Sequence, residues 1–209
     1  MHDCCESKAH EITALRTDYG HVLKVVFAIN LVMFFMEFGG GLLARSTALL
    51  ADSLDMFGDA AVYAVSLYVL HKSEQWQARA ALLKGLLMAG FGAAVLVEVL
   101  QKVIAGVVPT ASLMSMFGLL ALLANTTCAV MLLRFRTGEI NMRSTWVCSR
   151  NDVIANLGVV VAALGVAATR SAWPDILIGT LIAAIFFYSS FGVLRDSFRQ
   201  LFSHTADAT

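Results

Sequence analysis

Residues 47–70 read TALLADSLDMFGDAAVYAVSLYVL, and residues 144–169 read STWVCSRNDVIANLGVVVAALGVAAT. Both stretches are long and apolar enough to suggest membrane helices, yet the first contains three aspartates and the second a cysteine and an aspartate. An ionised side chain near the middle of a bilayer costs at least ~3 kcal/mol, so such residues usually face a cavity or a partner. Cations are the natural partners of clustered acids and a thiol. The two stretches therefore indicate transport of a metal ion.

The composition indicates a membrane protein. Of 209 residues, 58% are hydrophobic and only 14% are charged, whereas about 25% of a soluble domain is charged. A spanning helix needs ~20 mostly apolar residues, and too little polar sequence remains to cover a soluble helical core. We therefore predict an all-α membrane protein with six transmembrane helices. The six apolar segments are residues 25–43, 47–70, 81–105, 111–133, 144–169 and 174–195.

The distribution of charge predicts the orientation. The net charge is zero, so a nucleic-acid partner has no electrostatic support. With a cytoplasmic N-terminus, the Lys and Arg residues divide twelve inside to three outside, which predicts that both termini are cytoplasmic. No cleavable signal peptide is expected, because residues 1–20 are polar. The inner set is Lys8, Arg16, Lys24, Lys72, Arg79, Lys84, Arg134, Arg136, Arg143, Arg150, Arg195 and Arg199, and the outer set is Arg45, Lys102 and Arg170.

The chain divides into a tail at residues 1–20, a transport domain at residues 21–200 and a short tail at residues 201–209. Both tails are expected in the cytoplasm. His2, Cys4 and Cys5 place metal donors close together at the N-terminus. Such density suits capture of a soft cation on a flexible tether, and the alternative is a disordered tail without function.

A second set of donors lies in the loop between the second and third spans. His71 and Glu74 could form a second metal site there, although a solvated loop is the simpler interpretation. Cys128 has no acidic neighbour on its own helical face and is expected to pack as a small apolar residue.

The aspartates of the second span share one helical face. Asp52, Asp55 and Asp59 are spaced three and then four residues apart, and residues at this spacing are neighbours on a helix. Cys148, Asp152 and Asn156 of the fifth span are spaced four and four residues apart, so they also share one helical face.

If the two faces meet, Asp55, Asp59, Cys148 and Asp152 supply four ligands. Zn²⁺ prefers tetrahedral coordination by such donors, and a thiolate shifts preference toward soft ions. Counted along the helices, Asp55 and Asp59 lie ~12–18 Å from the outer end of their span and Asp152 lies ~25 Å from the outer end of its own. The mismatch is about one turn, which helix tilt or unequal helix ends can absorb.

These residues carry a family resemblance. The segment ADSLDMFGD at residues 51–59 resembles the second-helix signature of the cation diffusion facilitator family. Asp152 with Asn156 resembles the fifth-helix signature, and Trp173-Pro174-Asp175 resembles the usual start of the sixth helix. The six-span plan also matches, as do the polar residues Asn30 and Glu37 of the first span. The resemblance covers roughly residues 20–200.

The resemblance implies a homodimeric efflux carrier in the plasma membrane that exchanges a divalent metal for protons. Zn²⁺ or Cd²⁺ would be the cargo, with Co²⁺ or Fe²⁺ also within range, and no other cofactor is expected. Asp55, Asp59 and Asp152 match the family's acidic ligands, while Cys148 stands where the family often has His. The family usually continues into a cytoplasmic ferredoxin-like domain. A chain without that domain would dimerise through its membrane part, or more weakly.

Several roles stay open on the sequence alone. Asp52 either makes a hydrogen bond to a neighbouring helix or lines the ion path, and Asn156 orients either Asp152 or the metal shell. Cys148 is either a ligand or a packed thiol, and Glu37 and Glu98 are either helix locks or proton relays. A membrane metal sensor or assembly subunit that does not transport is the alternative function. An enzyme is not expected, because no nucleophile–base pair or nucleotide-binding loop is present.

Overall fold

A computed structural model describes the backbone of residues 3–69, 74–136 and 140–206, with side chains mainly of residues 18–61, 82–136 and 149–195. These residues form six helices, which agrees with the predicted all-α fold. The helices are α1 (Asp3–Ala44), α2 (Thr47–Val69), α3 (Glu74–Ala105), α4 (Ala111–Leu133), α5 (Ile140–Thr169) and α6 (Trp173–Ala206).

Five of the six helices contain stretches long and apolar enough to cross a membrane, among the residues described. The helix outside this set is α2, because Asp52, Asp55 and Asp59 interrupt its apolar sequence. The prediction of an all-α membrane protein is therefore confirmed at this level, while the sixth span stays a prediction. The five stretches are Asp18–Ala44, Gly85–Ala105, Ala111–Leu133, Ser149–Thr169 and Trp173–Gly192.

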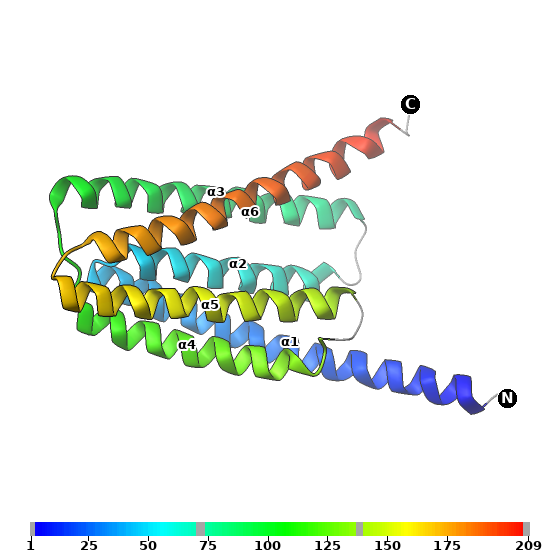
Figure 1. The fold of residues 1–209 in the computed structure, drawn as a ribbon. Coiled ribbons are helices and arrows are strands. Elements are labelled where there is room, and N and C mark those ends of the chain that lie inside the picture. The colour runs from blue at the N-terminus through cyan, green and yellow to red at the C-terminus, as the bar shows by residue number, and fades with distance from the viewer. Residues whose placement is uncertain (1–2, 70–73, 137–139, 207–209) are drawn as a thin grey trace.

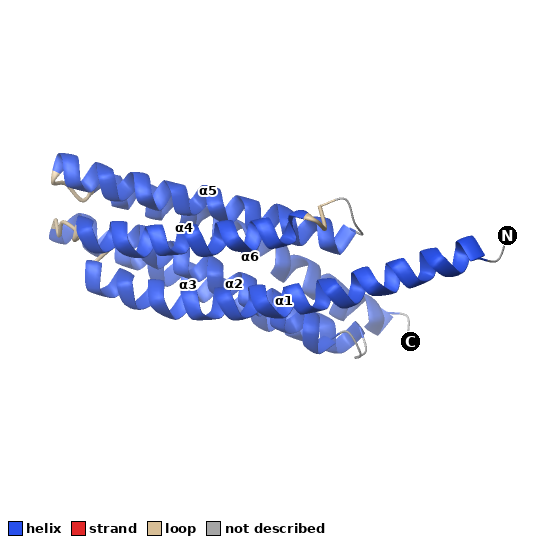
Figure 2. Ribbon diagram, turned by 90° about the horizontal axis from the view of Figure 1, so that it is seen from below, coloured by secondary structure: helices blue, strands red, loops and turns tan. Residues whose placement is uncertain are grey.

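Helix α2 lies at the centre of the bundle. It packs against each of the other five helices, whereas α3 packs mainly on α6 and α4 mainly on α5. Figure 1 shows α3 and α6 crossing on one side of α2, with α1, α4 and α5 on the other, and Figure 2 shows the six helices running alongside one another. A central helix is shielded from lipid by its neighbours. This position explains how α2 can carry three acids.

The outer surface of the bundle is apolar. Large hydrophobic side chains stand exposed on every helix except α2 among the described residues, for example Phe35 at 65%, Ile104 at 86% and Leu123 at 65%. A water-soluble protein rarely exposes so much contiguous apolar surface. In a bilayer this surface would contact lipid, and the helices satisfy their backbone groups internally as the hydrocarbon requires.

The two ends of the bundle differ. One end, here called the short-loop end, holds the connections at residues 45–46, 106–110 and 170–172. Each helix that arrives there is followed by a residue with left-handed backbone: Arg45 (φ 54°), Gly106 (φ 64°) and Arg170 (φ 51°). A left-handed residue ends a helix and reverses the chain within a few residues. The terminal segments of α1 and α6 lie at the opposite end (Figure 1).

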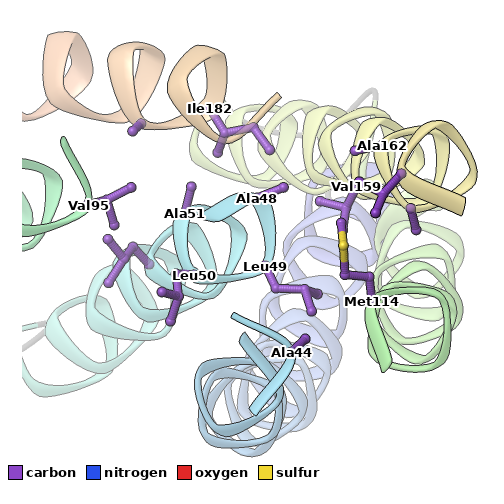
Figure 3. Packing of buried hydrophobic residues seen from close by; sticks show 14 of the residues in the cluster. Ala44, Ala48, Leu49, Leu50, Ala51, Val95, Met114, Val159, Ala162 and Ile182 are labelled. Carbon is purple, nitrogen blue, oxygen red and sulfur yellow. The ribbon is translucent and has the colours of Figure 1, made fainter. Parts of the chain in front are cut away.

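The core is built from small and branched side chains. Ala48, Ala51, Val95, Val159 and Ile182 belong to the largest buried cluster, which joins α2 to α3, α5 and α6 (Figure 3). Small residues let membrane helices approach closely.

Glycines in α1 show the same effect. A Cβ on Gly40 would come within 2.5 Å of the Phe117 ring, and one on Gly41 within 2.9 Å of Leu50. The helices therefore approach closely at these two positions. Gly39 has no neighbouring atom within 4 Å, so the third glycine does not take part.

The N-terminal tail differs from the expectation of a flexible tether. Helix α1 begins at Asp3 and continues unbroken into the first apolar segment. Residues 3–19 contain neither glycine nor proline, so nothing in them interrupts a helix. Figures 1 and 2 show this part of α1 projecting beyond the bundle.

Candidate metal site between α2 and α5

The predicted faces of α2 and α5 meet at one hydrogen bond. Asn156 Nδ2 of α5 donates to Asp52 Oδ1 of α2 across 3.2 Å, and also to the backbone oxygen of Asp152 across 2.9 Å. Both partners are buried, with Asp52 at 1% and Asn156 at 0% exposure. Asp52 therefore makes the bond to a neighbouring helix that was one of its two expected roles. Asn156 connects Asp52 to the turn of α5 that carries Asp152.

This bond gives the register of the two helices. The two helices run in opposite directions. Depth along the bundle can therefore be counted from the Asp52–Asn156 pair toward the end opposite the short-loop end. At 1.5 Å per residue, Asp55 lies about 4.5 Å below the pair, Asp152 about 6 Å and Asp59 about 10.5 Å. The carboxylate of α5 is thus at a level between the two of α2. The backbone of Cys148 lies about 12 Å below the pair, close to the level of Asp59.

The expected mismatch of one turn has a simple origin. Asp52 is five residues from the start of α2 at Thr47, whereas Asn156 is thirteen residues from the end of α5 at Thr169. Helix α5 therefore continues about 12 Å further toward the short-loop end, which is about two turns and more than the one turn expected. Unequal helix ends, rather than a wrong pairing, account for the difference.

Glu37 of α1 joins the same buried region. Its side chain is completely buried, approaches the Asp52 carboxyl and interacts electrostatically with Asp55 as well. Within the described part of the chain, neither carboxyl oxygen of Glu37 nor Oδ2 of Asp52 accepts a hydrogen bond. Two carboxyl groups attract each other only when one is protonated and can donate. Glu37 and Asp52 therefore form a buried pair of carboxyl groups beside the contact between α2 and α5.

The remaining acids of the predicted ligand set lie close by but do not form a ready shell. Asp55, Asp59 and Asp152 are partly buried, and each makes further interactions. Across the described residues, no group of three or more His, Cys, Asp or Glu side chains is arranged to hold a metal ion. The side chain of Cys148 lies outside the described residues. The four-ligand set thus stays a prediction.

Comparison with known proteins identifies the family. The sequence-family model of the cation efflux transmembrane domain matches residues 23–202, which make up most of the chain. The chain belongs to the cation efflux family. The resemblance to cation diffusion facilitators drawn from residues 51–59 and 152–156 is thereby confirmed.

Three known proteins resemble this chain at low identity. The cation efflux system protein CzcD of an Alcaligenes species and the metal cation efflux system protein CzcD of Cupriavidus metallidurans are each 22% identical over 197 residues, covering 88% of this chain. The zinc transporter ZitB of Yersinia pestis is 25% identical over 192 residues, covering 86% of this chain. In each case the match spans 62% of the relative's length.

Several donors named from the sequence cannot be placed in this cation efflux fold. The side chains of His2, Cys4 and Cys5 lie outside the described residues, and so does His71. The expected metal capture by the tail and the second site in the loop stay predictions. The tail nevertheless differs from the expected tether in its backbone, since α1 begins at Asp3.

Cys128 packs as expected. It is fully buried in a cluster of α1 and α4 side chains that includes Val26 and Leu132. Its own helical face carries no acid, as expected, but Asp59 of the neighbouring helix α2 interacts electrostatically with the thiol. Sequence spacing reports neighbours on one helix and misses those on another.

Two residues with a clear structural role were not recognised as a pair from the sequence. Lys102 is one of the outer cations in the charge count, and Asp175 belongs to the predicted start of the sixth helix. The structure joins them in a buried ion pair with 2.6 Å between Lys102 Nζ and Asp175 Oδ2. A lysine within an apolar segment was the available signal, because an unpaired lysine is rarely buried.

Proposed function

We propose that this chain exports divalent metal ions, with Zn²⁺ or Cd²⁺ as cargo, in exchange for protons. The Asp52–Asn156 hydrogen bond carries the proposal, because it sets the acidic face of α2 opposite the acidic residue of α5. The names of the relatives, two cation efflux system proteins and a zinc transporter, support the same class of cargo. Co²⁺ and Fe²⁺ belong to the cargo range to be tested.

In the proposed mechanism, Asp55, Asp59, Asp152 and Cys148 bind the ion. Three carboxylates and a thiolate form a donor set that suits four-coordinate Zn²⁺, and the thiolate also favours the softer Cd²⁺. Protons and metal compete for the same carboxylates, because a bound cation favours their charged form and desolvation favours their neutral form. That competition lets a proton gradient drive export. The binding site would open alternately to the two sides by rocking of helices around it.

The cellular setting is part of the proposal. An excess of Lys and Arg near one end of the bundle supports cytoplasmic termini and an outward-facing short-loop end. We place the protein in the plasma membrane as a multi-pass homodimer held by its membrane helices. No enzymatic activity is proposed.

Flux in proteoliposomes tests this function. The purified chain should move Zn²⁺ and Cd²⁺ into or out of vesicles in response to an imposed pH gradient. Asp59→Asn removes one ligand charge without changing size, and it should reduce flux more than about 100-fold, which exceeds the usual loss from a supporting residue. Asp18→Asn is the matched control, because Asp18 is 61% exposed and lies outside the site; its flux should match the native chain.

The outcome separates the proposal from its alternative. Native flux by Asp59→Asn would overturn the ligand assignment. Tight metal binding by the native chain with no flux under any gradient would point instead to a membrane metal sensor or assembly subunit.

A further inference from the structure

A carboxylate from α6 caps the start of α2. Asp175, in the first turn of α6, accepts hydrogen bonds from Ser46 Oγ at 2.5 Å, from the Thr47 backbone nitrogen at 2.8 Å and from the Ala48 backbone nitrogen at 3.1 Å. The first N–H groups of a helix have no partner within the helix, and a negative charge there is favourable. The cap of α2 is thus supplied by a residue nearly 130 positions away in sequence.

A lysine from α3 completes this arrangement. Lys102 Nζ lies 2.6 Å from Asp175 Oδ2 and 3.2 Å from Thr47 Oγ1, and it also donates to the backbone oxygen of Arg45. The side chains of Lys102 and Asp175 are 2% and 0% exposed. An ammonium group has three donors, and all three are used. Lys102, Asp175, Ser46 and Thr47 are called the short-loop lock below.

The backbones of α2 and α6 also touch at the lock. Gly179 follows Asp175 by one turn, and a Cβ at that position would lie 2.7 Å from the Thr47 carbonyl carbon and 2.8 Å from the Ala48 nitrogen. Separating α6 or α3 from α2 would therefore expose a packed backbone contact and leave a buried charge without its partner, which is strongly unfavourable. The lock ties the start of α2 to two other helices at once.

The lock lies close to the candidate metal site along α2. Asp55 is eight residues beyond Thr47, which places it about 12 Å from the lock. Between them, Ala51 belongs to the interface of α2 with α3 and α6 (Figure 3), and it is 1% exposed. An ion that leaves the site toward the short-loop end moves past the first two turns of α2, and the packing of α3 and α6 on these turns holds them in place.

We infer that Lys102 and Asp175 are positioning residues that hold α2 against α3 and α6 and so keep the cation site closed toward the short-loop end. The inference rests on the proposed transport function for its biological meaning, but the closure itself can be measured without metal or flux. Release of the ion at that end then requires the lock to open.

Labelling of a buried cysteine tests the closure. Ala51→Cys is introduced into a chain whose four native cysteines are replaced by alanine, and a membrane-impermeant maleimide is applied to each face of membrane vesicles separately. With the lock intact, labelling should be slow from both faces. Lys102→Met, which keeps the length of the side chain but removes its charge, should increase the labelling rate at least about fivefold from the face at the short-loop end only.

Matched variants separate closure from general loosening. Lys102→Arg keeps the charge and should stay close to the intact lock, while Arg170→Asn removes an exposed cation of the same end and should change nothing. Exchanging the pair, Lys102→Asp with Asp175→Lys, should not restore slow labelling, because the new lysine would face the N–H groups of α2. A simple ion pair would be restored by the exchange.

Several outcomes of the labelling experiment would overturn the inference. Unchanged labelling in Lys102→Met overturns the inference, and so does an equal increase from both faces or an equal increase in Arg170→Asn. Should Lys102→Met fail to yield a single monodisperse species, Thr47→Val removes one acceptor of Lys102 and should raise labelling about twofold from the same face; no increase there overturns the inference. Absence of flux in the native chain would refute the proposed function while leaving the labelling result intact.

Discussion

Single side chains that cross between helices organise the buried centre of this cation efflux protein. Asn156 uses its amide to satisfy both Asp52 on α2 and a backbone oxygen of its own helix. Glu37 adds a second carboxyl beside Asp52 from α1. A buried polar group is costly unless it is hydrogen-bonded, so these contacts restrict how the three helices can pack.

We predict that the choice between metal ions depends on one side chain, Cys148. Cys148→Ser should weaken Cd²⁺ binding about tenfold or more and Co²⁺ or Mn²⁺ binding much less, because a thiolate favours soft ions. Calorimetry with each metal measures the change. Cys128→Ala is the control, since that thiol packs in an apolar cluster and its loss should leave all the affinities similar. An equal loss for every metal, or none, would make Cys148 a packing residue.

At the scale of helices, close backbone contact lets α2 occupy the centre of the bundle. Gly179 allows α6 to rest on the first turn of α2, whereas Gly192, later in the same helix, has no atom within 4 Å of its Cβ position. The two glycines therefore differ in their packing. The first makes room for a neighbour, and the second faces open space.

Replacement of these glycines should separate the two situations. Gly179→Ala forces a shift of backbone atoms, and overpacking of this kind costs about 1–3 kcal/mol. A loss of 1 kcal/mol lowers the melting temperature by roughly 2–4 °C in a domain of this size. Gly192→Ala should be neutral or stabilise by up to about 1 kcal/mol, since alanine favours a helix. Thermal unfolding in one detergent measures both, and equal melting temperatures would contradict the packing argument.

At the scale of the whole molecule, the bundle has a tied end and an end from which helices project. The short-loop end is fixed by the lock and by a hydrogen bond from the Thr110 nitrogen to the Ala44 oxygen. The opposite end carries both terminal helical segments (Figure 1). The N-terminal part of α1 projects beyond the bundle, and we expect the donors His2, Cys4 and Cys5 to raise the local metal concentration without forming the transport site.

Removal of the tail tests that role. Deletion of residues 2–10 should raise the apparent KM severalfold and leave maximal flux largely unchanged, because capture affects delivery rather than translocation. Alanine at His2, Cys4 and Cys5 in the full-length chain should have the same effect while keeping the helix. Flux measured against metal concentration decides. A collapse of maximal flux with unchanged KM would assign the tail a structural or gating role instead.

Much of this organisation follows from local sequence. Six apolar stretches predict six helices, and the three-and-four spacing of Asp52, Asp55 and Asp59 predicts one acidic face, because helix geometry depends only on near neighbours. The same reasoning identified α5 as the facing helix. It was wrong about the flexible tail, since it treated polar sequence as a tether although no glycine or proline interrupts residues 3–19.

Only the tertiary structure decided which contacts form between helices that are far apart in sequence. Asp52 meets Asn156 across 104 positions and Lys102 meets Asp175 across 73. Sequence alone could place the first pair on facing helices. Counting residues from the helix ends gave the wrong relative depth, because α2 and α5 end at different levels. Sequence could not pair the second at all, because a lysine and an aspartate at the ends of two helices serve equally well as surface charges. Burial distinguishes the two cases, since a charge taken out of water requires a partner, and burial is a property of the assembled bundle.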